Sequence, residues 1–288
     1  MDDRPCRRKK YCRTESFTRD VQSMQSSLPF TLWRHRSLVF ELVKREFSSK
    51  YRGSLGGVFW SLAHPLFLLG IYTIAFGVIL QSRWNNSGSA VDYALMLFAG
   101  LIVFNAFSEV LSKSPLLITG NPNFVKKVVF PLELLPIVTV AAAYLQALVG
   151  TGILLAGYVI FVGMPRPTVF LFPLVLLCFA PVLLGLAWLL SAIGVAVKDI
   201  GQLTGMLSHS LLFLTPIFYS MDSAPDVIKN LLMLNPLTFI VEQFRLVLLA
   251  GGMPSFLGLA VYIGLASVFS WASLTLFRRL RTTFADMV

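Results

Sequence analysis

The chain has 288 residues, of which 56% are apolar and only 13% are charged. A typical soluble domain carries about 25% charged residues and about 45–50% apolar residues. This composition excludes an ordinary soluble enzyme, a disordered chain and a collagen-like chain, and it predicts an all-α polytopic membrane protein.

The net charge of +10 is concentrated at the N-terminus, where residues 1–56 hold 13 Lys and Arg against 6 Asp and Glu. A basic tail can bind nucleic acid, but on a membrane protein it marks the cytoplasmic side and contacts anionic lipid headgroups. We therefore expect membrane lipid and no nucleic acid as its partner. Residues 1–27 are expected to form a disordered cytoplasmic tail, and residues 28–288 a single transmembrane domain.

Residues 37–51 predict an N-terminal amphipathic helix that lies on the cytoplasmic membrane surface. At about 100° per residue, its apolar side chains share one arc of the helix. These side chains are Val39, Phe40, Val43, Phe47 and Tyr51. Two interpretations stay open, namely a plain juxtamembrane anchor and a docking surface for a cytoplasmic partner.

Six apolar runs approach or exceed the length of about 20 residues that a spanning helix needs. They lie at about 57–80, 92–111, 134–162, 168–197, 202–220 and 255–277. Outer-membrane strands would instead alternate in polarity over about ten residues. With six spans, 20 of the 24 Lys and Arg residues lie on the side of the termini. The positive-inside rule then places both termini in the cytoplasm.

Residues 225–251 do not have the pattern of a plain span. Asn235-Pro236 interrupts the run, and Glu242 and Arg245 follow the break. A seventh span would put the basic residues of 278–281 outside, so charge favours a re-entrant helix pair between spans 5 and 6. Broken helices at membrane depth occur only where protein or a cavity covers them. Glu242 and Arg245 stand on one helix face, either as part of a gate or as a pair that satisfies itself.

The sequence contains no pattern that indicates catalysis or a metal site. It has no GxxxxGK[ST] phosphate loop, no HExxH motif and no zinc-spaced Cys and His residues. Spans 1, 3, 4 and 6 also lack acidic residues in their middles, which argues against ion-driven transport. We therefore expect a chain that is not an enzyme, that holds no cofactor, and that receives its energy from a partner.

Four segments carry a resemblance to a known family. They are YRGSLGGVFWSLAHPL at 51–66, NPNFVKKVVFP at 121–131, DIGQLTGMLSHSLLFLTPIFYS at 199–220 and NPLTFIVEQFRLVLLAG at 235–251. In this order and spacing they resemble the permease subunit of ABC-2-type exporters of polysaccharides and polyol phosphates. That family serves O-antigen, teichoic acid and capsule glycan export. The chain departs from the family pattern at Gly56-Gly57, where Leu-Gly is usual, and at His64, where Asn is usual.

The resemblance implies a homodimer of six-span subunits in the bacterial inner membrane, joined to two ATP-binding-cassette subunits that hold ATP and Mg²⁺. It implies export of a lipid-linked polysaccharide such as O-antigen. Two alternatives stay open: an ABC-2 exporter of a drug, a small lipid, teichoic acid or capsule, and a membrane scaffold without transport activity.

The resemblance also implies site residues. An ATPase-coupling helix is expected at Asn121, Pro122, Asn123, Phe124, Val125, Lys126, Lys127 and Val128. An external re-entrant gate is expected at Asn235, Pro236, Leu237, Glu242 and Arg245. A cytoplasmic gate at the mouth of span 1 is expected at Tyr51, Arg52, Gly56, Gly57 and Trp60. Because aromatic faces suit sugar C–H faces, the channel-lining candidates are Tyr72, Phe76, Phe213, Phe218 and Tyr219, with lipid contact or packing as the favoured alternative for most of them.

Overall fold

The computed structural model describes residues 33–49, 59–75, 90–125, 131–197, 199–221 and 225–287. The chain divides into two compact units, residues 1–42 and 43–288, and each is described by itself. In the first unit, the Arg36 guanidinium lies 4.9 Å from the centroid of the Trp33 ring, at the start of helix α3 (Arg36–Ser49). The expected N-terminal helix is thus confirmed, and its place on the membrane surface stays a prediction. The boundary expected at residue 27 lies outside the described residues.

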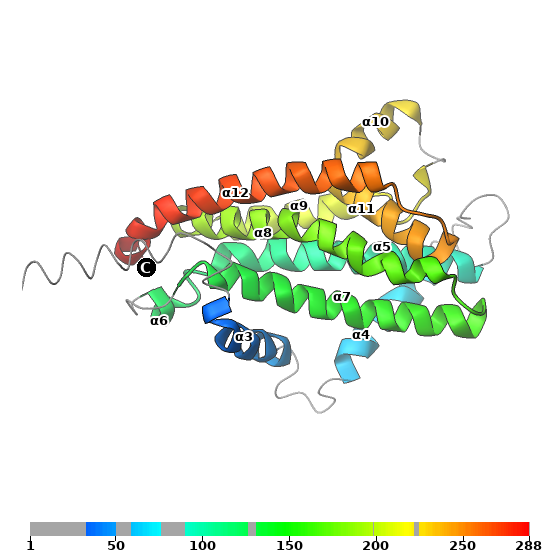
Figure 1. Ribbon diagram of the computed structural model, residues 1–288, viewed down its shortest axis with the longest axis horizontal. Coiled ribbons are helices and arrows are strands. Elements are labelled where there is room, and N and C mark those ends of the chain that lie inside the picture. The colour runs from blue at the N-terminus through cyan, green and yellow to red at the C-terminus, as the bar shows by residue number, and fades with distance from the viewer. Residues whose placement is uncertain are drawn as a thin grey trace, which may run out of the picture. The chain divides into compact units, whose positions relative to one another are not determined.

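Four long apolar helices form the frame of the second unit (Figure 1). They are α5 (Ala90–Lys113), α7 (Leu134–Phe161), α8 (Phe172–Ala196) and α12 (Phe256–Met287). With the short 3-10 turns η2 (Ser114–Leu116) and η3 (Pro167–Leu171) added to α5 and α8, these are the helices of the described chain that are long and apolar enough to cross a bilayer. They confirm an all-helical fold over the described residues, and they lie where spans 2, 3, 4 and 6 were expected.

The remaining two expected spans contain shorter helices. α4 (Phe59–Tyr72) has 14 residues and continues as a π-helical turn to residue 75, where this described range ends, and α9 (Ile200–Leu214) has 15 residues. At 1.5 Å per residue α9 is about 22 Å long, against about 30 Å for the hydrocarbon core. α9 ends before the expected residue 220 because Pro216 disfavours a helical conformation at the residue before it. Thr215 is accordingly extended, with φ −108° and ψ 139°. Residues 76–80 of the expected first span lie outside the described residues.

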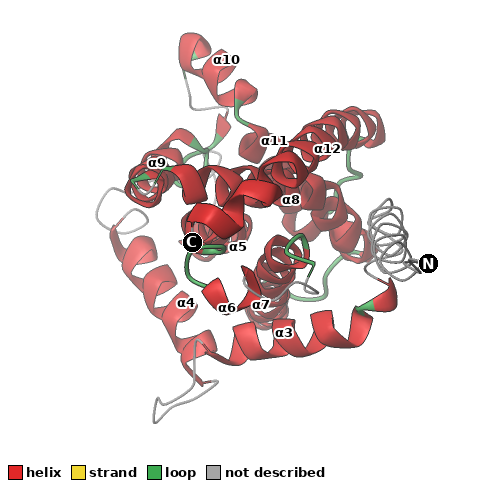
Figure 2. Cartoon of the chain, turned by 90° about the vertical axis from the view of Figure 1, so that its left-hand side faces the viewer, coloured by secondary structure: helices red, strands yellow, loops and turns green. Residues whose placement is uncertain are grey.

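α5 is the centre of the second unit. More than half of its residues are buried, and it packs against α7, α8, α9 and α11 (Pro236–Arg245), as Figure 2 shows for the helices around it. Its sequence is apolar on every face, which is typical of a fully enclosed helix. α12 instead packs along α8 and exposes large apolar side chains such as Leu257, Leu265 and Trp271. An apolar stripe of this kind suits lipid rather than water.

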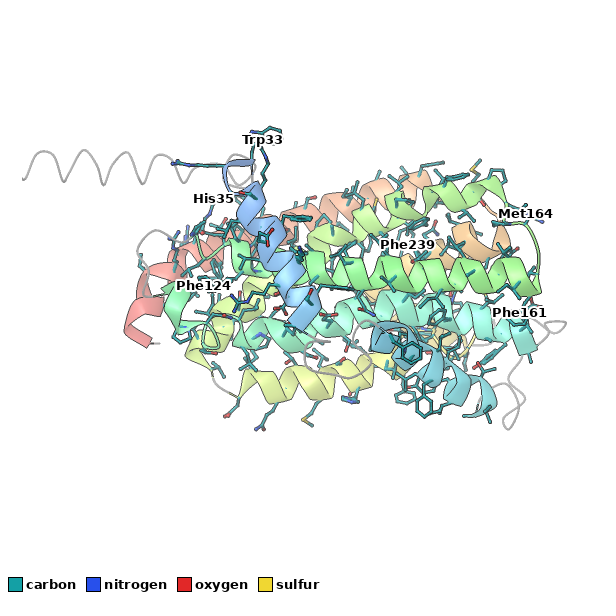
Figure 3. The ribbon with its side chains drawn as sticks, turned by 90° about the horizontal axis from the view of Figure 1, so that it is seen from below. Trp33, His35, Phe124, Phe161, Met164 and Phe239 are labelled. Atoms are coloured by element: carbon teal, nitrogen blue, oxygen red, sulfur yellow. The ribbon has the colours of Figure 1, made fainter. Side chains whose placement is uncertain are left out.

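The two ends of the helix bundle carry different short elements. One end carries α6 (Pro122–Val125) with Phe124, and the opposite end carries the α7–α8 connection with Phe161 and Met164 (Figure 3). Between α9 and α12 the chain forms α10 (Asp226–Leu234), α11 and the π-helical turn η5 (Leu246–Ala250). α10 and α11 have 9 and 10 residues, so neither is long enough to cross a bilayer.

Candidate functional site

The segment after α9 is a buried break in helical structure. Thr215 and Ile217 are fully buried and Phe218 is 5% exposed. Backbone groups in such a break lose their helical partners and need others, because an unpaired backbone group away from water costs free energy. The structure supplies those partners from helices that are far away in the sequence.

Arg245 supplies most of the hydrogen-bond donors for this segment. Its side chain is 2% exposed, and its guanidinium donates from Nε to the Met96 carbonyl oxygen of α5 over 2.9 Å. Nη1 donates to the Pro216 carbonyl oxygen over 2.6 Å, and Nη2 donates to that of Ile217 over 3.0 Å. The guanidinium therefore joins α5, the break after α9 and its own helix α11.

Glu242 and Gly100 complete the surroundings of this guanidinium. Glu242 Oε1 lies 3.1 Å from Nη1 of Arg245, while the Glu242 side chain is 37% exposed. Gly100 gives the guanidinium room, because a Cβ there would lie 2.6 Å from Nη2. Tyr93 adds a further bond from α5, donating its hydroxyl to the Phe218 carbonyl oxygen over 3.1 Å. The pair that was predicted on one helix face therefore exists, and its arginine mainly binds backbone.

Asn235 joins the start of α11 to the end of α9. Its Oδ1 accepts a bond from the Leu237 amide over 3.0 Å, which caps the helix that Pro236 opens. Its Nδ2 donates to Thr215 Oγ1 over 3.0 Å. All five residues expected in the external gate thus lie in or beside one network, and Leu237 is buried in the core.

The aromatic candidates for the channel lining lie together near this break. The rings of Tyr72 and Phe218 meet edge to face with centroids 5.3 Å apart, and those of Phe213 and Phe218 are 5.6 Å apart. Tyr219 donates its hydroxyl to the Phe213 carbonyl oxygen over 3.1 Å. Phe218 belongs to the core, whereas Phe213 is 61% exposed. Phe76 lies outside the described residues.

Next to this cluster is a cavity of about 290 Å³ between α4, α5, α7 and α9. Its lining includes Tyr72 and the polar side chains of Asn105, Glu109 and Gln146. Ionisable side chains within apolar spans often line a cavity or a path, and amide side chains there often hydrogen-bond between helices. Sequence reasoning passed over Asn105 and Gln146, although a polar amide inside an uncharged run is a signal that could have found them.

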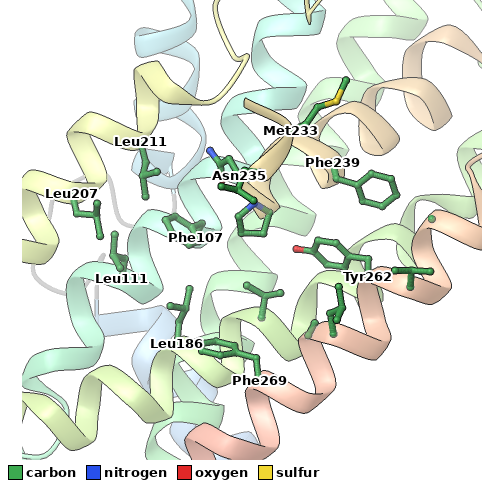
Figure 4. Close-up of a pocket in the computed structure, with 17 residues that line it drawn as sticks. Phe107, Leu111, Leu186, Leu207, Leu211, Met233, Asn235, Phe239, Tyr262 and Phe269 are labelled. Atoms are coloured by element: carbon green, nitrogen blue, oxygen red, sulfur yellow. The ribbon is translucent and has the colours of Figure 1, made fainter. Parts of the chain in front are cut away.

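A second, larger groove lies beside α11 and has a volume of about 690 Å³ (Figure 4). Helices α5, α8, α9, α10, α11 and α12 line it with mostly apolar side chains. Asn235, Phe239 and Tyr262 lie at the rim nearest the helix pair. The Phe239 and Tyr262 rings stack with centroids 5.6 Å apart and an interplanar angle of 24°, which fastens α11 to α12.

The expected coupling helix is described only in part. Asn121 donates from Nδ2 to the Leu117 carbonyl oxygen over 2.9 Å, and α6 follows it with a partly buried Phe124. Asn123 and Val125 belong to this helix, while Lys126, Lys127 and Val128 lie outside the described residues. Of the expected cytoplasmic gate, Trp60 belongs to α4, and Tyr51, Arg52, Gly56 and Gly57 lie outside the described residues.

The described residues form a hydrogen-bond network, a cavity and a groove. They contain no cluster of three His, Cys, Asp or Glu side chains that could hold a metal ion. The arrangement instead joins a broken segment, a small cavity lined in part by polar side chains, and an apolar groove. Non-helical backbone at membrane depth occurs where protein buries it or where it lines a cavity.

Known proteins with similar sequences include membrane transporters. Residues 37–249 match the family described as ABC-2 type transporter. The chain is 26% identical over 259 residues to the O-antigen export system permease protein RfbA of Myxococcus xanthus, covering 89% of this chain and 97% of that protein. It is also 21% identical over 267 residues to the protein of the same name from Klebsiella pneumoniae, covering 92% of this chain and 100% of that protein.

These matches run along most of the chain and include the broken segment, the helix pair and the region of α6. They confirm the predicted family of transporter membrane subunits, whose role is to form a passage rather than to catalyse a reaction. The chain belongs to the ABC-2 type transporter family.

Proposed function

We propose that this chain is the channel-forming subunit of an ATP-driven exporter that moves a lipid-linked cell-surface polysaccharide, of the O-antigen kind, out of the cytoplasm. The observation that carries the proposal is the likeness to permeases named for O-antigen export, which extends over 89% of this chain and 97% of the relative from Myxococcus xanthus.

The topology that fits this function has six spans, both termini in the cytoplasm and a re-entrant helix pair. Four long helices supply spans 2, 3, 4 and 6, and α4 and α9 supply the cores of spans 1 and 5. An even number of spans keeps the basic tail and the basic residues of 278–281 on one side. This side faces the cytoplasm of a bacterial cell, and the membrane is the inner membrane.

The passage forms where two copies of the chain meet. Moving a sugar hydroxyl from water into hydrocarbon without a hydrogen-bond partner costs several kcal/mol. A glycan therefore needs a continuous polar path across the membrane. Within one subunit, the cavity beside Asn105 and Gln146 supplies part of such a path, and the exposed ring of Phe213 offers an aromatic face for sugar C–H groups. The apolar groove beside α11 faces the hydrocarbon, where the lipid part of the substrate remains.

Energy comes from two ATP-binding-cassette subunits that hold ATP and Mg²⁺. Each docks on the cytoplasmic segment of residues 121–128. α6 lies at the end of the bundle that is opposite the α7–α8 connection (Figure 3), which suits an element that a cytoplasmic partner has to reach. The external gate is the α10–α11 pair, held by Asn235 and Arg245.

Deletion of the gene in its native host tests the proposed function. Lipid-linked glycan is expected to accumulate inside the cells and to disappear from their surface, and a plasmid copy of the wild-type gene restores both. Normal surface glycan together with altered drug sensitivity would instead support a drug or small-lipid exporter. Copurification with an ATPase separates both of these from a scaffold, which needs no such partner.

A further inference from the structure

Ion pairs flank both ends of the segment that joins α5 to α7. At the end of α5, Lys113 Nζ lies 2.6 Å from Glu46 Oε1 on α3 and 3.2 Å from Glu109 Oε1. Just before α7, Glu133 Oε1 lies 2.9 Å from Nη1 of Arg281 on α12. Charge therefore ties both ends of the segment that holds the coupling helix to helices that are distant in sequence.

The pair at Glu133 is the more enclosed of the two. Glu133 is 6% exposed, and Nη1 of Arg281 reaches both of its carboxylate oxygens, at 2.9 and 3.3 Å. The Glu133 carbonyl oxygen also accepts a bond from Trp188 Nε1 of α8 over 3.2 Å. A buried carboxylate without a hydrogen-bonded cationic partner is costly in free energy. Arg281 therefore fixes the position of the chain where the coupling segment enters α7.

α12 carries this contact to the other end of the bundle. The helix has 32 residues, which corresponds to about 48 Å at 1.5 Å per residue. It packs directly against α8, because Gly185 leaves no space for a Cβ beside the Phe269 ring. Near its start, Tyr262 stacks on Phe239 of α11, and the Ser255 amide donates to Gln243 Oε1 over 2.8 Å.

The surroundings of α12 also suit movement better than those of α5. More than half of the residues of α5 are buried, and the helix is linked to the break after α9 through Arg245 and Tyr93. α12 packs mainly on α8 and exposes its other face. A helix held on one side tilts with fewer lost contacts, because a packed core resists small displacements.

We propose that Glu133 and Arg281 are positioning residues that link the coupling segment to α12, so that α12 transmits its displacement to α11. The inference rests on the proposed function, since it assigns the route between the ATPase and the external gate. The proposed route runs from the Glu133–Arg281 ion pair, along α12, to the stacked rings of Phe239 and Tyr262. Its two ends can be broken separately.

The test uses the complex of this chain with its ATPase subunits in proteoliposomes, with export of lipid-linked glycan and ATP hydrolysis measured together. Glu133→Gln and Arg281→Gln are each expected to lower the glycan exported per ATP by about fivefold or more, in the range of typical coupling between sites. Assembly and basal ATP hydrolysis are expected to stay at the wild-type level. Exchange of the two charges, Glu133→Arg with Arg281→Glu, is expected to restore most of the export.

Arg279→Gln is the matched control, because it removes the same charge from an exposed position of the same helix. It should leave export per ATP unchanged. Tyr262→Ala breaks the other end of the route and also tests the link if the Glu133 variants do not yield an intact complex. It should lower export per ATP to a similar degree, and combining it with Arg281→Gln should add little.

Wild-type export per ATP in Arg281→Gln or in Tyr262→Ala would overturn the link, as would a charge exchange that assembles without recovery. The wild-type arm separates this failure from failure of the proposed function. If the wild-type chain binds no ATPase and exports no glycan, the proposed function is wrong and the link falls with it. If the wild type exports and the variants export equally well, only the link is wrong.

Discussion

Arg245 and Arg281 hold two parts of the molecule together in different ways. Arg245 is fully enclosed, and three of its bonds go to backbone carbonyl oxygens of α5 and of the break after α9. Arg281 is 23% exposed and bonds a side-chain carboxylate. Backbone acceptors cannot turn away, whereas a carboxylate and a guanidinium can part and find water. The difference indicates a firm anchor at Arg245, at the C-terminal end of α11, and a more solvent-accessible ion pair at Arg281.

Loss of the Arg245 side chain should have the largest effect on stability. Arg245→Leu leaves the carbonyl groups of Met96, Pro216 and Ile217 without their donors and should cost about 3–5 kcal/mol of folding free energy. Thermal unfolding of the purified chain in detergent measures this. Arg166→Gln is the control, since Arg166 is exposed and donates one bond to the Ala250 carbonyl oxygen. Equal stability of the Arg245→Leu and Arg166→Gln variants would contradict a firm anchor at Arg245.

A methyl group at Gly100 should disturb the same network from the side of α5. Gly100→Ala places a Cβ where the Arg245 guanidinium lies, and overpacking of this kind costs about 1–3 kcal/mol. Gly152→Ala in α7 meets nothing within 4 Å and should be neutral or slightly stabilising. Unfolding of both variants in detergent gives the comparison. A Gly100→Ala variant as stable as Gly152→Ala would place the guanidinium elsewhere.

Loss of the Glu133 charge should have a smaller effect on stability. Glu133→Gln keeps the size of the side chain and leaves Arg281 access to water, so about 1.5–3 kcal/mol is expected, the value of a hydrogen bond to a charged group. Glu133→Gln should impair export per ATP strongly while lowering the free energy of unfolding only modestly. A variant that loses stability in proportion to export would show that the pair is a structural fastening like Arg245.

The smallest effect is expected at Glu46. The Glu46 and Lys113 side chains are 34% and 33% exposed, and Lys113 has Glu109 as a second partner. Glu46→Gln should therefore change the unfolding free energy by less than about 1 kcal/mol, and less still at high salt. Unfolding at low and at high ionic strength measures this. A larger effect that survives salt would show that this end of the segment is fastened as firmly as Arg245.

The lengths of the apolar runs and the positions of the residues that interrupt them predict much of the fold. The helices expected at 92–111, 134–162 and 168–197 are found within a few residues of those limits, because long uncharged runs have few alternatives in a membrane. α12 continues beyond the expected residue 277 to Met287, since Arg278 and Arg281 are compatible with a helix that leaves the membrane. Asn235-Pro236 marked the start of α11 because Asn caps and Pro opens helices.

Contacts between distant segments could not be predicted in the same way. The spacing of Glu242 and Arg245 indicated a pair on one helix face, but not that the guanidinium binds carbonyl groups of two other elements. The link from Glu133 to Arg281 spans 148 positions in sequence, and no local pattern records it. Asn105 and Gln146 were passed over because an amide side chain carries neither a charge nor an aromatic ring.

Transport by the purified complex tests the central claim most directly. The chain and its ATPase partner are reconstituted in vesicles that contain lipid-linked glycan, and glycan on the side opposite the ATPase is measured with and without ATP. ATP-dependent appearance of glycan is expected, and it should be lost when ATP hydrolysis on the partner is blocked. An intact complex that hydrolyses ATP while glycan stays on the ATPase side would contradict the account.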